Sequence, residues 1–199
     1  MLWCQVMPRA LILFAHPCDD SFSAALHKTV LDALTAKGWD IDDCDLYAEG
    51  FNPVLTAAER RGYHDVARNT APVQSYVDRL RQADALVLVF PVWNYGFPAI
   101  LKGFFDRVFL SGVSFTLVDG RVKPNLMNIR KLAAITTYGG TRVKTFLAGD
   151  PPRRVVTRSI RYVCGARKLR YLALHDMNRV SAAQRAAHLA RVRAEMEAF

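Results

Sequence analysis

The sequence has few cysteines, and none of them form a close pair. Cys4, Cys18, Cys44 and Cys164 are far apart and form no CxxC motif. Zinc sites and disulfide frameworks need closely or regularly spaced cysteines. The sequence therefore indicates neither a metal site nor a disulfide scaffold. We expect reduced thiols in a cytoplasmic protein, with Cys164 buried in a helix.

The sequence has no long apolar run, and we expect no leader peptide in it. The runs 10–15 and 85–90 stop at His16-Pro17 and at Pro91, short of the roughly 18 residues that a membrane span needs. The apolar N-terminus has no leading basic region and is interrupted by Arg9, which is unlike a signal peptide. We expect a soluble protein with no membrane span. Its 199 residues, without internal repeats or linkers, fit a single domain over residues 1–199.

Acidic residues are outnumbered, with 18 Asp and Glu against 27 Lys and Arg, which gives a formal net charge of +9. The segment 151–170 contains basic residues and no acidic one. A solvated helix face explains such a run, and so does a surface that attracts an anionic cofactor such as a nicotinamide dinucleotide. Nucleic acid is disfavoured as a partner because aromatic residues are not interleaved with this cluster as a stacking platform requires.

What the chain does have is an alternation of apolar strands and helical patterns. Strand patterns run over 9–16, 39–47, 84–90, 131–138 and 168–177, and helical patterns begin near Ser21, Thr56, Pro72, Pro98, Pro152 and Ser181. Ser181 and Gln184 fit a capping box. Because most of the strands are apolar throughout, the pattern predicts an α/β protein with a parallel sheet covered by helices on both faces. The common order for five such strands is 2-1-3-4-5.

Sheets of this order bind ligands outside the carboxyl ends of the first and third strands. The loop after the first strand, His16 to Ser23, has hydroxyls and backbone N–H groups at a helix start, which favour a phosphate; ordinary N-capping is the alternative. The loop after the third strand, Pro91 to Phe97, offers aromatic faces and Asn94 to a flat heteroaromatic ring. A hydrophobic plug or a dimer contact would explain it too. After the fourth strand, a Gly-Gly turn lets the backbone approach a ligand closely.

Four stretches resemble the flavodoxin-like NAD(P)H:quinone oxidoreductases of the flavodoxin-2 type. They are FPVWNYGFPAILKGFFDRVF (90–109), AHPCDDSFSAAL (15–26), DLYAEGFNPVLTAAE (45–59) and TTYGG (136–140). The stretches follow the family's order, and 90–109 is the most specific of them. The resemblance implies a flavodoxin-like fold with a bound flavin, FMN or FAD, and NAD(P)H as hydride donor.

The resemblance also implies which residues bind the flavin. The phosphate end would be held by residues of the first loop: His16, Ser21, Phe22 and Ser23. The isoalloxazine ring would be bordered on one side by Pro91, Val92, Trp93, Asn94, Tyr95 and Gly96. Its other side would be closed by Thr137, Tyr138, Gly139 and Gly140. Helix packing, rather than flavin contact, is the implied role of Gly103, Phe104, Asp106 and Arg107.

One feature departs from the family pattern. Better-studied members carry a Tyr and a His beyond the Gly-Gly turn as candidate proton donors. Here no His occurs between His64 and His175, and Tyr138 lies inside the turn. The proton donor of the family can therefore not be assigned to a residue here, and Tyr138 is kept as the candidate catalytic residue. Hydride transfer depends on stacking and orientation more than on acid–base residues, because the flavin carries the chemistry.

The implied activity is ping-pong transfer of a hydride from NAD(P)H through the flavin to a quinone or similar electrophile. The family also implies a homodimer, with Tyr47, Phe51, Trp93 and Phe97 expected as an exposed aromatic cluster near its interface. Three alternatives remain. They are an ancillary flavin-binding subunit of a potassium-efflux system, an electron-carrier flavodoxin and a flavin-free binding module. The electron carrier is disfavoured by the basic charge and by the lack of a hydroxyl- and Gly-rich phosphate loop.

Overall fold

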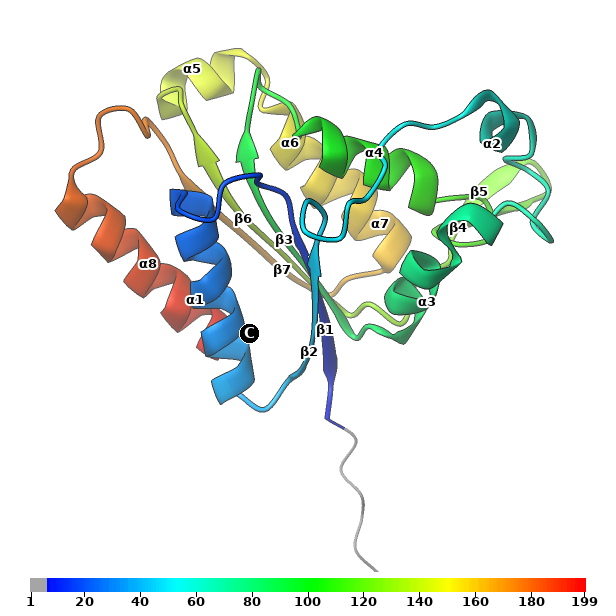
Figure 1. Cartoon of the computed structure of the whole chain (residues 1–199), viewed down its shortest axis with the longest axis horizontal. Helices are drawn as coiled ribbons and strands as arrows, with labels where there is room; N and C mark the ends of the chain where they lie inside the picture. The colour runs from blue at the N-terminus through cyan, green and yellow to red at the C-terminus, as the bar shows by residue number, and fades with distance from the viewer. Residues whose placement is uncertain (1–6) are drawn as a thin grey trace, which may run out of the picture.

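The computed structural model describes residues 7–199. Five strands form one all-parallel sheet in the order β2-β1-β3-β6-β7 (Figure 1). They are β1 (Arg9–Phe14), β2 (Asp40–Asp45), β3 (Ala85–Val92), β6 (Lys131–Tyr138) and β7 (Lys168–Leu174). Counted along this sheet, the order is 2-1-3-4-5, so the predicted flavodoxin-like α/β class is confirmed.

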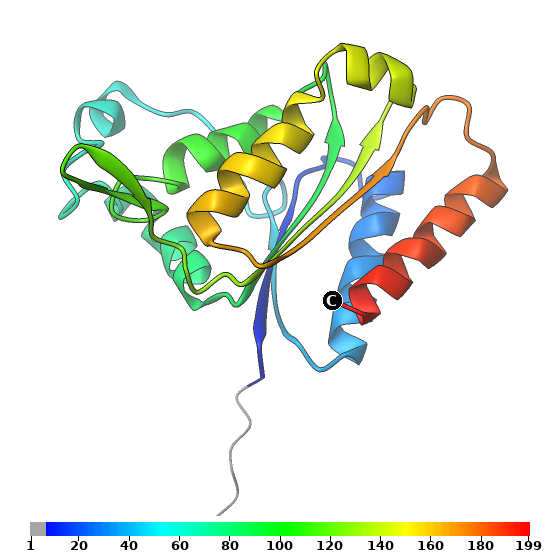
Figure 2. The ribbon, with the colours of Figure 1, turned by 180° about the vertical axis from the view of Figure 1, so that it is seen from behind.

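Helices cover both faces of the sheet (Figure 1, Figure 2). One face carries α1 (Phe22–Ala36) and α8 (Ala182–Glu197), and the other carries α3 (Gln74–Gln82), α4 (Ala99–Val108) and the helical segment 151–164. Alternate residues of a strand serve opposite layers. Ile12 packs in the core beneath α1 and α8, whereas Leu11 and Leu13 pack in the core on the other face. No helix within residues 7–199 has the length and apolar character to cross a membrane.

Three predicted helix starts are N-caps. Ser181 Oγ accepts from the Gln184 N–H at 3.2 Å while Gln184 Oε1 accepts from the Ser181 N–H at 2.8 Å, so the predicted capping box is confirmed. Thr56 opens α2 (Ala57–Arg61) with a second capping box. At the start of α1 the cap is Ser21, whose Oγ accepts from the Ala24 N–H at 3.1 Å.

The glycine and arginine of the 90–109 stretch fix α4 in place. A Cβ built on Gly103 would lie 2.3 Å from the carbonyl oxygen of Pro53, so only glycine allows this contact. Arg107 pairs with Glu59 and donates to the carbonyl of Asn52. These contacts confirm the packing role predicted for this part of the chain. Asp106 is different, because it pairs with Lys102 on the helix surface.

Several elements escaped the sequence reading. β4 (Phe115–Val118) and β5 (Arg121–Pro124) form an antiparallel hairpin, and α5 (Arg142–Leu147) follows the Gly-Gly turn. The predicted basic helix is a succession of α6 (Pro151–Arg154), the π-helical turn η2 (Val155–Ile160) and α7 (Arg161–Cys164). A 3-10 turn, η1 (Ala71–Val73), precedes α3 and contains the proline expected at that helix start. Cys164 is buried in its helix, as expected.

The expected exposed aromatic cluster is wrong in two of its four members, because Phe97 is half-buried against the core and Phe51 is buried. Phe51 is only 5% exposed, with its ring centroid 5.0 Å from that of Tyr76 and 5.5 Å from that of Phe104. Its loop folds beneath α4, so the ring fills the space between helices. Tyr47 and Trp93 are exposed, at 37% and 40%.

Candidate functional site

Three loops meet at the carboxyl ends of β1, β3 and β6 (Figure 1). The rings of His16 and Trp93 lie edge to face with centroids 5.6 Å apart, which joins the first loop to the second. The Tyr95 hydroxyl lies 3.4 Å from where a Cβ on Gly140 would be, which joins the second loop to the third. The structure therefore brings the three predicted flavin-binding loops together at this edge of the sheet, in the region between His16, Trp93 and Gly140 that we call the crevice. Their role as flavin ligands stays a prediction.

The first loop presents hydrogen-bond donors at the start of a long helix. α1 has 15 residues and no acidic residue in its first turn, so its backbone N–H groups and dipole favour an anion there. Ser23 is buried and Phe22 is half-buried. His16 Nδ1 lies 3.0 Å from the Cys18 nitrogen and 3.2 Å from the Cys18 carbonyl oxygen, so this ring atom contacts the backbone of its own loop.

The aromatic turn follows directly on β3, which continues through Pro91 and Val92 and is thus two residues longer than predicted. Asn94 and Tyr95 have φ angles of 49° and 57°, and Trp93 and Gly96 exchange backbone hydrogen bonds of 3.2 and 2.8 Å. This is the geometry of a type I′ turn. A tyrosine at positive φ is strained, and such strain is concentrated at functional sites. The turn holds the Trp93 and Tyr95 rings at the surface, each 40% exposed.

The third loop contains Tyr138, whose hydroxyl does not face the crevice. The side chain is 1% exposed, and its hydroxyl donates to Asp150 at 2.7 Å and is hydrogen-bonded to the Tyr171 hydroxyl. Its ring stacks on His175 with centroids 4.5 Å apart. Burial, with Tyr171 and Asp150, raises its pKa far above the ordinary value. This geometry fits a role in positioning Gly139 and Gly140, and a catalytic role for Tyr138 stays a prediction.

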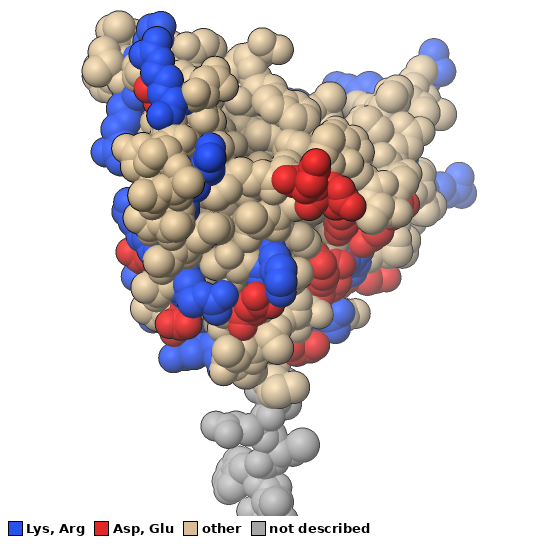
Figure 3. All heavy atoms as spheres, turned by 60° about the vertical axis from the view of Figure 1, so that its left-hand side comes forward, with Lys and Arg blue, Asp and Glu red and all other residues tan. Residues whose placement is uncertain are grey.

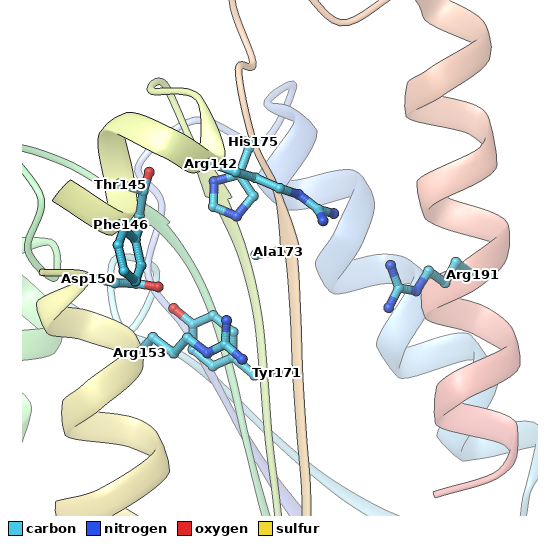
Figure 4. A pocket seen from close by; sticks show the side chains of 9 residues that line it. All are labelled: Arg142, Thr145, Phe146, Asp150, Arg153, Tyr171, Ala173, His175 and Arg191. Carbon is cyan, nitrogen blue, oxygen red and sulfur yellow. The ribbon is translucent and has the colours of Figure 1, made fainter. Parts of the chain in front are cut away.

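A cationic cleft of about 300 Å³ lies beyond the Gly-Gly turn, at the carboxyl end of β7 (Figure 4). Its lining is Arg142, Thr145, Phe146, Asp150, Arg153, Tyr171, Ala173, His175 and Arg191. Burial, and then the charge of Arg142, lowers the pKa of His175 below its ordinary value. The sequence reading missed this cleft. Its available signals were the basic run that contains Arg153 and the position of His175 at the end of a strand.

Apolar surface adjoins the crevice on two sides. An apolar groove of about 490 Å³ extends from Gly96 and Phe97 along α4 to the π-helical turn. On α5, Val143, Phe146 and Leu147 are 68%, 78% and 77% exposed. Such a patch beside a ligand crevice is typical of a surface that binds a partner or a ligand.

The strand order and the three converging loops define a flavodoxin-like α/β protein with a ligand site at its topological switch point. A family model described as a flavodoxin-like fold matches residues 8–199, and the chain belongs to this family.

Known proteins similar to the chain are oxidoreductases by name. NAD(P)H dehydrogenase [quinone] 1 of Rattus norvegicus is 34% identical over 147 residues, which are 66% of this chain and 54% of the rat protein. The NAD(P)H oxidoreductase YcaK of Escherichia coli (strain K12) is 31% identical over 135 residues, or 67% of this chain and 66% of YcaK. Thus the aligned part of the chain spans about half the length of the rat relative.

Among solved structures, Smu.1420 from Streptococcus mutans UA159 superposes with a TM-score of 0.87 at 30% sequence identity. The superposition covers 96% of this chain and 100% of that one. The fold therefore extends over the whole sheet and its helices, including the C-terminal part that the sequence resemblance did not reach.

Proposed function

We propose that this chain is a flavin-dependent NAD(P)H oxidoreductase that reduces quinones or similar electrophiles. The observation that carries the proposal is the convergence of the His16, Trp93 and Gly140 loops at the switch point. The names of the rat and E. coli relatives, an NAD(P)H dehydrogenase [quinone] and an NAD(P)H oxidoreductase, support the choice of reaction.

The residues of the crevice fit a flavin. The backbone N–H groups at the start of α1, with Ser21 and the His16 ring, would hold the phosphate end. The exposed rings of Trp93 and Tyr95 would form an apolar wall for the isoalloxazine ring. Gly140 has no side chain, so its backbone can approach the ring from the other side. When bound, FMN or FAD supplies the two-electron hydride chemistry.

The chain itself would orient the reactants. The type I′ turn fixes the two aromatic rings, and the hydrogen bonds from Tyr138 to Asp150 and Tyr171 fix the end of β6 that leads into the Gly-Gly turn. Holding two reactants in stacking geometry is the main contribution a protein makes to such a transfer. In this proposal donor and acceptor occupy the same face of the crevice in turn, which leads to ping-pong kinetics.

A homodimer is part of the proposal. Trp93, Tyr95, Phe146 and Leu147 expose apolar side chains around the crevice, and a second copy would cover them and exclude water from the reacting face. Light scattering at micromolar concentration should give the mass of a dimer. The free thiols of Cys18, Cys44 and Cys164 accord with the cytoplasmic location we propose.

The test begins with the cofactor. Purified protein is denatured, and the released flavin is identified by chromatography; apoprotein is then titrated with FMN and FAD. Rapid mixing of the flavin-loaded protein with NADH or NADPH should bleach the flavin absorbance, and a benzoquinone should restore it with parallel-line kinetics. Failure to bind either flavin overturns the proposal. Binding without bleaching by either nucleotide removes the enzyme assignment and favours a carrier or regulatory role.

A further inference from the structure

The cationic cleft at the edge of the sheet draws its charges from three separate elements (Figure 4). Arg142 is the first residue of α5, Arg153 belongs to α6 on one face of the sheet, and Arg191 belongs to α8 on the other. In Figure 4, the Arg142 and Arg191 side chains both extend into the gap beside the end of β7. The fold therefore gathers residues almost 50 positions apart around one cavity.

These three guanidinium groups have no carboxylate partner. Among residues 7–199, none of them forms an ion pair. Asp150 is the one acidic residue in the lining, and it already accepts a hydrogen bond from Tyr138. Three positive charges against one negative charge leave an excess of two. Like charges that converge on a cavity repel one another, and a bound anion offsets this repulsion because it attracts each of them.

The remaining lining residues suit an oxyanion. The Arg153 guanidinium lies 5.6 Å from the ring centroid of Tyr171, a contact that holds its planar fork in place. His175 also lines the cleft, and its Nδ1 has no hydrogen-bond partner in the described part of the chain. Arginine forks match the geometry of phosphate oxygens better than any other side chain does.

Only Thr145 and the Gly-Gly turn separate the cleft from the proposed flavin crevice. Thr145 lines the cleft, and its Oγ1 lies 3.8 Å from where a Cβ on Gly140 would be, on the turn that borders the crevice. In the view of Figure 3, Lys and Arg side chains gather at the upper left of the molecular surface, whereas lower down they alternate with Asp and Glu side chains. A local excess of positive charge attracts anions.

We propose that Arg142, Arg153 and Arg191 form a phosphate subsite for the hydride donor, so that a phosphate of NAD(P)H lies in this cleft while its nicotinamide reaches the crevice. This inference rests on the proposed function. The phosphate is either the 2′-phosphate of NADPH or the diphosphate that NADH shares with it, and the two sources predict different responses to the same substitutions.

The first test is independent of the flavin and of activity. Inorganic phosphate and adenosine 2′-phosphate are titrated into the wild type, Arg153→Gln and Arg191→Gln, and binding is read by calorimetry and by the rise in Tm. Each substitution should raise the dissociation constant about tenfold, or ~1.4 kcal/mol. Matched controls are Arg158→Gln, in the π-helical turn, and Arg193→Gln, on α8 beside Asp32; both residues lie outside the cleft and should leave binding unchanged.

The second test uses the flavin-loaded protein. The rate of flavin bleaching is measured against NADH and NADPH concentration for the wild type, Arg153→Gln, Arg191→Gln and both controls. If Arg153→Gln and Arg191→Gln weaken the binding of NADPH alone, the cleft binds the 2′-phosphate. If they weaken the binding of both nucleotides, the cleft binds the diphosphate. Unchanged binding of both overturns the subsite even if bleaching is normal. If neither nucleotide bleaches the wild type, the proposed function fails, and any phosphate binding seen in the first test then belongs to another ligand.

Discussion

A single substitution at two helix starts separates a phosphate site from an ordinary cap. Ser21 and Ser181 both accept a hydrogen bond from the N–H three residues on, at 3.1 and 3.2 Å, and neither helix has an acidic residue in its first turn. Aspartate caps a helix as well as serine does, and its charge favours the helix dipole. Without flavin, Ser21→Asp and Ser181→Asp should therefore each change stability by no more than a few tenths of a kcal/mol.

With flavin, the two variants should diverge. If the phosphate lies at the start of α1, a new carboxylate about 4 Å away repels it by up to ~4 kcal/mol at an effective dielectric near 20. Solvent and side-chain relaxation reduce this figure. We expect at least a tenfold loss of flavin affinity for Ser21→Asp, or ~1.4 kcal/mol, and none for Ser181→Asp. Asp20 does not change the comparison, because its side chain is exposed and Ser21 is the cap.

The assay is a fluorescence titration of FMN and FAD into both apoproteins, with urea unfolding of each as the stability control. Equal flavin affinities in the two variants would refute the reasoning. The first loop would then be only a helix cap, and the phosphate would lie elsewhere. A large loss of apoprotein stability in Ser21→Asp alone would contradict the equivalence of the two caps.

Three further outcomes can be checked. Gly103→Ala should destabilise the fold by about 1–3 kcal/mol in urea unfolding, because its Cβ would meet the Pro53 carbonyl oxygen at 2.3 Å. Burial lowers the pKa of His188, so below the ordinary pKa of about 6.5 the unfolded chain binds a proton that the folded chain resists. Stability should therefore fall as pH drops below about 6.5, and His188→Gln should reduce this fall in Tm. Cys18 is exposed, whereas burial raises the pKa of Cys164 to about 12, so iodoacetamide should label Cys18 long before Cys164. Bound flavin should slow the labelling of Cys18, and peptide mass mapping would measure both effects.

The sheet and its switch point were predictable because their signals are local. Each buried strand is a short apolar run, and the starts of α1, α2 and α8 carry serine or threonine caps that act within four residues. The topology of a parallel sheet then follows from few rules. The position of the crevice needed no information about tertiary contacts.

The hairpin carried a signal that was overlooked. Asp119 and Gly120 both have positive φ in the turn between β4 and β5, and an Asp-Gly pair is a strong indication of such a turn. The flanking Leu117, Val118 and Val122 are about half exposed, so the strands lack the alternation of buried and exposed residues that reveals a sheet strand. By contrast, the π-helical turn has no comparable sequence signal.

The cationic cleft could not have been found from the chain alone. Arg142 and Arg191 lie on exposed helix positions, where an isolated arginine indicates only a solvated surface. The two side chains line the same cleft because β7 is an edge strand, so no further strand separates its carboxyl end from α5 and α8. That is a property of the tertiary fold.

The position of Tyr138 along β6 decides which face of the sheet its side chain lies on. Leu132, Ala134 and Tyr138 share one face of β6 and pack in the same core layer. Alternation along the strand therefore directs the ring into the protein, away from the solvent. Only the fold shows what it meets there, which is Asp150, held at a φ of 45° beyond α5, and Tyr171 on the neighbouring strand. A hydroxyl bound on both sides in this way holds the two strands and the α5–α6 connection together.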